Sequence, residues 1–178
     1  MKITLIIVAI LIVLLVSIYA YYGGFRKISF RIEEQGGETL VYDNVVGDYK
    51  QATVVSDRVY YGLLNDEKIA TTKGFGIFYD NPKEVEKSKL RSEVGCIVEN
   101  LDSATIATLT QKYQVKTLPK TQCIVTEFPF KGGLSALIGL IKVYPALEKY
   151  TEKEKLKRSP IMEIYDVPNK TITYRQEI

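Results

Sequence analysis

A chain of 178 residues with a net charge of +3 has room for one domain with a proper core, and it lacks the dense basic blocks that nucleic acid binding requires. Histidine is absent, which removes the commonest metal ligand and the commonest general base. Cys96 and Cys123 lie in apolar, strand-like stretches, so we expect core residues of a reducing compartment, with a single bridge between them as the alternative.

The first segment of the chain is an uncharged, apolar run from Ile3 to Tyr22. Twenty residues at about 1.5 Å of rise cover roughly 30 Å, the thickness of a bilayer core. We therefore predict that residues 1–24 form a transmembrane anchor with a short flank, and that residues 3–22 contact the lipid bilayer. A signal peptide cleaved at Ala20 is the alternative, although the apolar run is longer than a usual signal core.

Basic residues are more frequent after this segment than before it. Arg26, Lys27 and Arg31 follow the apolar run, whereas Lys2 alone precedes it. The positive-inside rule therefore favours a single-pass membrane protein whose C-terminal domain faces the cytoplasm.

The first half of the remaining chain alternates apolar residues with turn-forming residues. This pattern predicts strands over 27–34 and 39–46 joined as a hairpin, a helix over 48–64, and strands over 74–79 and 91–99. A connector with a short helix over 103–112 follows, and Pro119 ends it.

The second half repeats this order. A strand over 121–128 precedes a strongly apolar helix over 134–143, and Pro145 is expected to open a new helical stretch, because proline fits a first turn but not a helix interior. Strands over 160–166 and 171–177 close the chain.

The two halves also share a short phrase. Residues 78–82 (FYDNP) match residues 164–168 (IYDVP), and at the same spacing Gly47 matches Gly133. We therefore predict an α+β fold of duplicated β-α-β-β units that form an antiparallel sheet, with helices on one side and a central cleft on the other. Repeat one covers about 25–100, the connector 101–119, and repeat two 120–178.

Four phrases in register resemble the GyrI-like family: 79–82 (YDNP), 89–95 (KLRSEVG), 143–147 (VYPAL) and 163–165 (EIY). That family is similar to the effector-binding domains of AraC-type regulators, and its membrane-anchored branch includes a testis-expressed autophagy receptor of the endoplasmic reticulum. The resemblance spans nearly the whole chain, including the N-terminal anchor, with residues 25–178 as the GyrI-like domain. It implies an aromatic ligand cleft where the repeats meet, often with a buried glutamate. The chain stops at Ile178 without the receptor's long tail, so we do not expect an autophagy-receptor role.

Strand parity gives an independent indication of the cleft. In residues 160–166, Met162 and Ile164 point one way, and the opposite side carries Ile161, Glu163 and Tyr165. If the helices cover Met162 and Ile164, the other three residues face the cleft, and the equivalent strand adds Phe75, Ile77 and Tyr79 to the predicted ligand-binding residues.

A carboxylate flanked by tyrosines suits a small cationic or aromatic ligand. The alternatives are that Glu163 is solvated or paired with a lysine on an open sheet face, and that the tyrosines only pack paired strands.

These features favour a membrane-anchored module that binds a small molecule or a protein partner. Two alternatives stay open: a hydrolase of reactive aromatic compounds that uses Glu163 as acid or base, and a membrane receptor or scaffold without the receptor tail. The sequence has no nucleophile-elbow pattern and no metal-ligand spacing, which speaks against an enzyme. We expect no cofactor, no metal and no nucleic acid.

Overall fold

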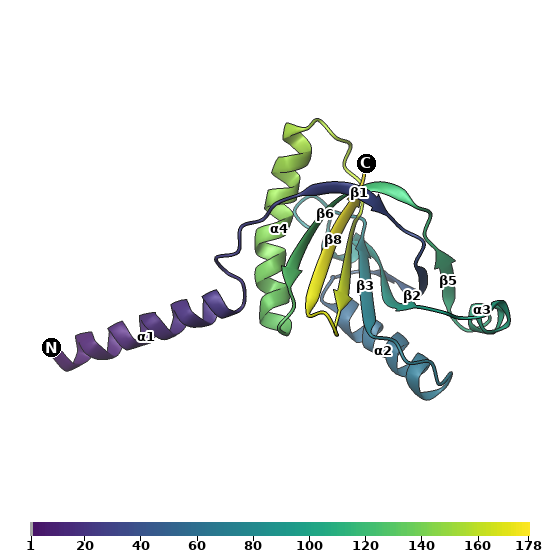
Figure 1. Ribbon diagram of the computed structural model, residues 1–178, viewed down its shortest axis with the longest axis horizontal. Helices are drawn as coiled ribbons and strands as arrows, with labels where there is room; N and C mark the ends of the chain where they lie inside the picture. Colours follow the sequence, from purple (N-terminus) through teal and green to yellow (C-terminus); the bar gives the residue numbers. More distant parts are fainter. Residues whose placement is uncertain (1) are drawn as a thin grey trace.

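In the computed structural model, which describes residues 2–178, a long N-terminal helix projects from an α+β domain (Figure 1). The helices are α1 (Lys2–Tyr21), α2 (Gln51–Asn65), α3 (Ser103–Thr110) and α4 (Gly133–Lys153). The strands are β1 (Arg31–Gln35), β2 (Thr39–Val46), β3 (Lys73–Phe78), β4 (Arg91–Val98), β5 (Gln114–Thr117), β6 (Thr121–Pro129), β7 (Ile161–Asp166) and β8 (Thr171–Glu177). A 3-10 turn at Lys87–Lys89 precedes β4.

All eight strands belong to one antiparallel sheet, in the order β1-β6-β8-β7-β3-β4-β2-β5. The β-α-β-β order occurs twice, as β2-α2-β3-β4 and as β6-α4-β7-β8. The two units meet where β3 pairs with β7. This arrangement confirms the predicted fold class. Gly47 and Gly133, however, do not occupy equivalent places in the two units, as the sequence match had predicted. Gly133 is the first residue of α4, whereas Gly47 lies ahead of the start of α2.

The predicted hairpin between the first two strands is wrong. β1 pairs with β6 and β2 pairs with β4 and β5, so the two strands lie at opposite ends of the sheet. The segment between β1 and β2 does not form a turn. It is hydrogen-bonded instead to the connector that precedes β6: the amide of Gly37 donates to the carbonyl oxygen of Leu118 at 2.8 Å, and the amide of Leu118 donates to that of Glu38 at 3.0 Å. The two crossing segments carry β1 and β5 to the edge of the other repeat.

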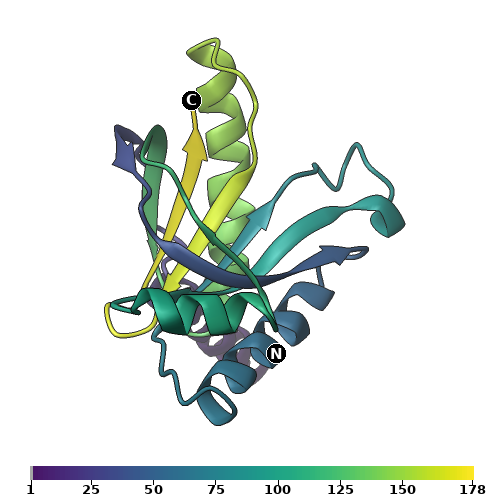
Figure 2. The same cartoon turned by 90° about the vertical axis from the view of Figure 1, so that its right-hand side faces the viewer.

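Helices α2 and α4 pack on the same face of this sheet. Val59 and Leu63 of α2 contact Val41 and Cys96 of the first repeat. In the second repeat, α4 packs against β6 and β8 through a cluster that consists of Ile138, Val143, Phe128, Ile172 and Tyr174. In Figure 2, α4 (light green) runs upward while α2 (blue) lies below it, so the two helices stand apart over the middle of the sheet. A separate apolar cluster covers the opposite face and consists of Leu40, Tyr42, Phe75, Ile77, Ile97, Met162 and Ile164.

The helix α4 is continuous, so the predicted break at Pro145 is wrong. Val143 and Leu147, on either side of the proline, are both buried. Their packing against the sheet holds the helix in one piece, although a proline removes one helix hydrogen bond and strains the preceding turn.

Cys96 and Cys123 are both buried and free, as core residues of the sheet. Burial raises the pKa of the Cys96 thiol to about 12, because a thiolate would be poorly solvated there. The thiol therefore stays protonated at neutral pH.

Among residues 2–178, α1 is the one helix that is both long and apolar enough to cross a membrane. The segment that follows it does not form a strand until Arg31, later than predicted, because it runs along α4 instead. The Nζ atom of Lys142 donates a hydrogen bond to the carbonyl oxygen of Arg26 at 2.7 Å and a second to that of Gly24. Phe30 packs on Tyr150 with ring centroids 5.0 Å apart. The end of α1 is thereby held close to the domain.

Candidate functional site

A cleft of about 1270 Å³ lies between α2 and α4, above the central strands β3 and β7. It lies on the same face of the sheet as the helices, so the prediction that it forms on the opposite face is wrong. The physical reason is local: where β3 crosses the cleft, it presents Gly74 and Gly76 toward the helices, so the space above Gly74 stays open and the ring of Phe78 lies over Gly76.

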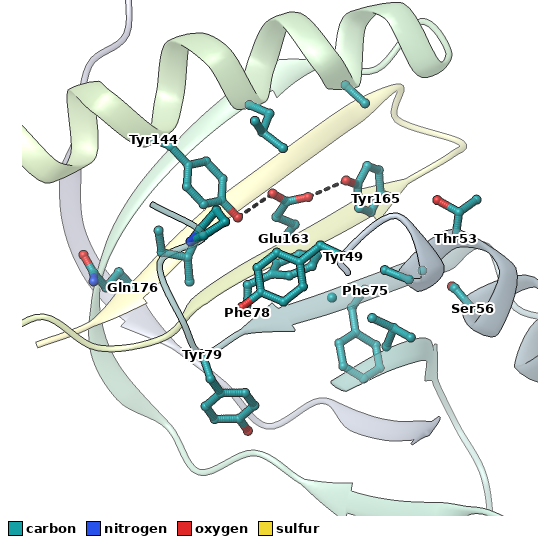
Figure 3. A pocket seen from close by; sticks show the side chains of 18 of the residues that line it. Tyr49, Thr53, Ser56, Phe75, Phe78, Tyr79, Tyr144, Glu163, Tyr165 and Gln176 are labelled. Carbon is teal, nitrogen blue, oxygen red and sulfur yellow. Dashed lines mark hydrogen bonds between the residues drawn. The ribbon is translucent and has the colours of Figure 1, made fainter. Parts of the chain in front are cut away.

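Glu163 lines this cleft, and the residue is 2% exposed. The hydroxyl of Tyr144, from α4, donates a hydrogen bond to Oε1 of Glu163 at 2.8 Å, and the hydroxyl of Tyr165 donates to Oε2 (Figure 3). Glu163 therefore links α4 to β7, the strand of the second repeat that borders the first repeat.

Burial raises the pKa of Glu163, and the two tyrosine hydrogen bonds, which favour the ionised form, only partly oppose this. Burial and the neighbouring carboxylate raise the pKa values of Tyr144 and Tyr165, so both phenols stay protonated and act as donors. Within residues 2–178, no basic side chain forms an ion pair with Glu163. The alternatives of a solvated glutamate and of a glutamate paired with a lysine are both wrong.

Aromatic rings from loops and strands surround this carboxylate. Tyr165 packs edge-on against Phe130, with centroids 5.5 Å apart, and Tyr49 packs in the same manner against Phe78 at 4.9 Å. The hydroxyl of Tyr49 is fixed because it donates to the carbonyl of Asp80 at 2.8 Å and accepts from the amide of the same residue at 3.0 Å. These rings are therefore held in place by protein contacts.

The structure brings together half of the predicted site residues. Ile161, Glu163 and Tyr165 all line the cleft, as strand parity predicted. Phe75 and Tyr79 border it, but their rings point away from Glu163 (Figure 3). Ile77 is buried on the opposite face with Met162.

A shift of one residue explains this difference. The match of Tyr79 to Tyr165 implied that odd-numbered residues of β3 share a face with odd-numbered residues of β7. In the sheet, Gly76 pairs with Glu163 and Gly74 pairs with Tyr165, so the even-numbered residues of β3 share that face. Directly paired residues share a face, so Phe78 and the two glycines are the residues of β3 on the cleft side. A slip of one residue moves each side chain of a strand to the other face.

Tyr144, which lines the cleft and donates to Glu163, is absent from the predicted site residues. It lies in the 143–147 phrase that carried the family resemblance, and it precedes the buried Leu147 by three residues, which places both on one side of a helix. A continuous helix through Pro145 would have indicated it. Tyr49, Phe78 and Phe130 come from three separate segments, and no local pattern joins them.

No family model matches the chain. Human Testis-expressed protein 264 is 34% identical over 99 residues, and its mouse homologue is 30% identical over the same length. The matched region makes up 52% of this chain and 32% of each relative, so the chain corresponds to about a third of those proteins.

Two solved structures share the fold. The C-terminal domain of EcmrR has a TM-score of 0.57 at 12% identity, over 84% of this chain and 96% of that domain. SAV2435, in a structure with bound tetraphenylphosphonium, has a TM-score of 0.54 at 17% identity, over 84% of this chain and 92% of that one. The chain is thus a distant homologue of Testis-expressed protein 264 and has the GyrI-like fold, which it shares with the C-terminal domain of EcmrR.

Proposed function

We propose that this chain is a membrane-anchored protein whose domain, residues 25–178, binds lipophilic aromatic cations in the cleft between its two repeats. The observation that carries this proposal is the buried carboxylate of Glu163, which has two tyrosine donors and no cationic partner among the described residues. The ligand would supply the missing positive charge.

The chemistry of the cleft favours a large, weakly hydrated cation. An ionised carboxylate in an apolar site is costly unless it is paired, and a cation with apolar groups around its charge loses little hydration on entering. The rings of Tyr165, Tyr144 and Phe78 offer faces and edges to such a ligand. The tetraphenylphosphonium bound to SAV2435 is a cation of this class.

The location of the domain is part of the same proposal. α1 is long and apolar enough to span a bilayer, and Arg26, Lys27 and Arg31 follow it. A cytoplasmic domain agrees with this charge distribution. The free cysteines Cys96 and Cys123 are also compatible with a reducing compartment.

Titration of the full chain in detergent with tetraphenylphosphonium tests the binding step. We expect saturable binding, with at least about tenfold weaker affinity in Glu163→Gln, which corresponds to about 1.4 kcal/mol. Glu148→Gln is the matched control, because Glu148 also lines the cleft but already pairs with Arg158 at 2.9 Å. Equal affinity of wild type and Glu163→Gln would contradict the proposal, and so would equal binding of the neutral triphenylphosphine oxide.

Glycosylation tests the topology. Asn169 is exposed in the turn between β7 and β8 and begins the sequence Asn-Lys-Thr, which is a glycosylation acceptor. In microsomes we expect Asn169 to stay unmodified, while an acceptor site added ahead of Lys2 is modified. The reverse pattern would place the domain in the lumen.

A further inference from the structure

The outward face of α4 is apolar over its first three turns. Leu134, Leu137 and Ile141 follow one another at helical spacings of three and four residues, so they lie on one side of the helix. They are 44%, 53% and 61% exposed. The buried residues of α4, such as Val143, lie on its other side against the sheet. A cluster of exposed large apolar side chains on a stable helix marks a contact surface.

This face lies beside the end of the apolar helix α1. The Nζ atom of Lys131 donates to the carbonyl oxygen of Tyr21 at 2.9 Å and lies 4.0 Å from the centre of its ring. Lys142 holds the following segment through the carbonyls of Gly24 and Arg26. Three backbone carbonyls at the exit of α1 are therefore bound by lysines that flank the apolar face.

The direction of α1 relates this face to a bilayer. In Figure 1, α1 leaves the domain from the side of α4 that is turned away from the sheet, and the axis of α1 crosses the axis of α4 rather than running parallel to it. A bilayer that contains α1 would therefore extend alongside α4. Phe25, in the segment between them, is 67% exposed and would lie at the same surface.

We propose that the outer face of α4 rests on the lipid bilayer, as a second membrane contact next to the anchor. The proposal rests on the membrane anchoring in the proposed function, and it adds an orientation to it. Apolar residues of an amphipathic helix enter the boundary between headgroups and acyl chains, whereas the sheet-facing side stays on the protein core. The polar last turns of α4, with Glu148 and Glu152 bound to Arg158, lie beyond the apolar stretch and stay in water.

This orientation has a consequence for the cleft. Ile141 and its neighbour Leu140 also line the cleft. The outer face of α4 therefore continues into one edge of the opening of the cleft. The opening then lies at the membrane surface, and a lipophilic cation dissolved in the bilayer reaches Glu163 without crossing bulk water.

The absence of tryptophan from the sequence permits a direct test. The full chain carrying Leu137→Trp is placed in phosphatidylcholine vesicles, with Val54→Trp as the control, because Val54 is 72% exposed on α2. Bromine atoms on the acyl chains are expected to quench the emission of Leu137→Trp several-fold more than that of Val54→Trp, while iodide in the water quenches mainly Val54→Trp. Ile141→Trp should behave as Leu137→Trp does, which guards against a folding defect in one variant.

Two results would overturn the proposed contact. If iodide quenches Leu137→Trp and Ile141→Trp as strongly as the control, the face lies in water. If neither quencher reaches them, another protein surface, such as a second copy of the chain, covers the face. Failure of the anchor itself is seen separately, since alkaline carbonate would then release the chain from the vesicles. Failure of ligand binding is likewise separate, because tetraphenylphosphonium affinity is measured in detergent.

Discussion

Gly76 and Glu163 lie directly opposite each other at the junction of the two repeats. The row of paired residues continues to Val94 on one side and to Tyr174 on the other, so this pair occupies the middle of the sheet. One repeat therefore contributes a carboxylate at the position where the other contributes a glycine, over which the ring of Phe78 lies. A side chain at position 76 would collide with that ring, so the glycine lets an aromatic ring of β3 lie on the cleft side opposite Glu163.

Cation binding should become tighter as the pH rises. Because burial raises the pKa of Glu163, part of the free protein carries a protonated carboxyl, and a cation must displace that proton. Calorimetric titration with tetraphenylphosphonium in buffers of different ionisation enthalpy should show proton release near the raised pKa. Glu163→Gln should bind weakly and with no such release. Affinity of the wild type that is independent of pH would show that Glu163 does not titrate with binding.

The contribution of Glu163 to the stability of the protein should fall as the pH rises above the ordinary pKa of a glutamate. The folded state holds the proton of Glu163 more tightly than the unfolded state, so this contribution to the unfolding free energy decreases from the unfolded pKa up through the raised folded pKa. Glu163→Gln removes this contribution. We expect the variant to gain thermal stability relative to wild type on going from pH 4 to pH 8, measured by near-UV circular dichroism without ligand. A constant difference across this range would argue against a raised pKa.

Tyr144→Phe should raise the pKa of Glu163 further. The hydroxyl of Tyr144 donates to Oε1 at 2.8 Å and stabilises the ionised form, so its loss favours the protonated carboxyl. The pH at which tetraphenylphosphonium affinity is half-maximal should move upward. Tyr61→Phe is a suitable control, since Tyr61 is exposed on α2, and it should leave the midpoint in place. A downward shift in Tyr144→Phe would contradict the assigned role.

Two glycines of the central strands should differ sharply in their tolerance of alanine. A Cβ atom at Gly95 would lie 2.1 Å from the carbonyl oxygen of Val41, and that backbone cannot move without breaking the pairing of β2 with β4. At Gly74 the nearest atom would be 3.7 Å away. We expect Gly95→Ala to cost at least about 1–3 kcal/mol, as overpacked cores do, while Gly74→Ala is neutral within about 0.5 kcal/mol. Thermal melts of the two variants in parallel provide the measurement.

Most of the elements of this fold are predictable from the sequence, because they follow from local patterns. The strand at Thr39–Val46 and the helix that starts at Ser103 match their predicted starts. In the structure the side chain of Asp102 caps that helix by accepting from the amide of Thr105. Glu163 and Tyr165 were placed together by the parity of a single strand. These features depend on neighbours in the chain.

Features that depend on partner strands were not predictable. The pairing of Gly76 with Glu163 is set by contacts between the repeats, and the sequence match of the repeats predicted the wrong face for the residues of β3. The continuous helix through Pro145 depends on burial of Val143 and Leu147 against the sheet. In both cases tertiary packing outweighs a local preference. The pairing of β3 with β7 also determines that the cleft lies on the face of the sheet that carries the helices.

The crossing of the two segments near Gly37 and Leu118 also has a consequence for biosynthesis. β1 leaves the ribosome directly after the apolar helix, yet its pairing partner β6 is made only after the entire first repeat. Until then its edge amides and carbonyls have no strand to pair with, close to a membrane surface. The earliest strand to be synthesised is thus among the last to find its pairing partner. Completion of the second repeat then fixes the anchor to the finished domain.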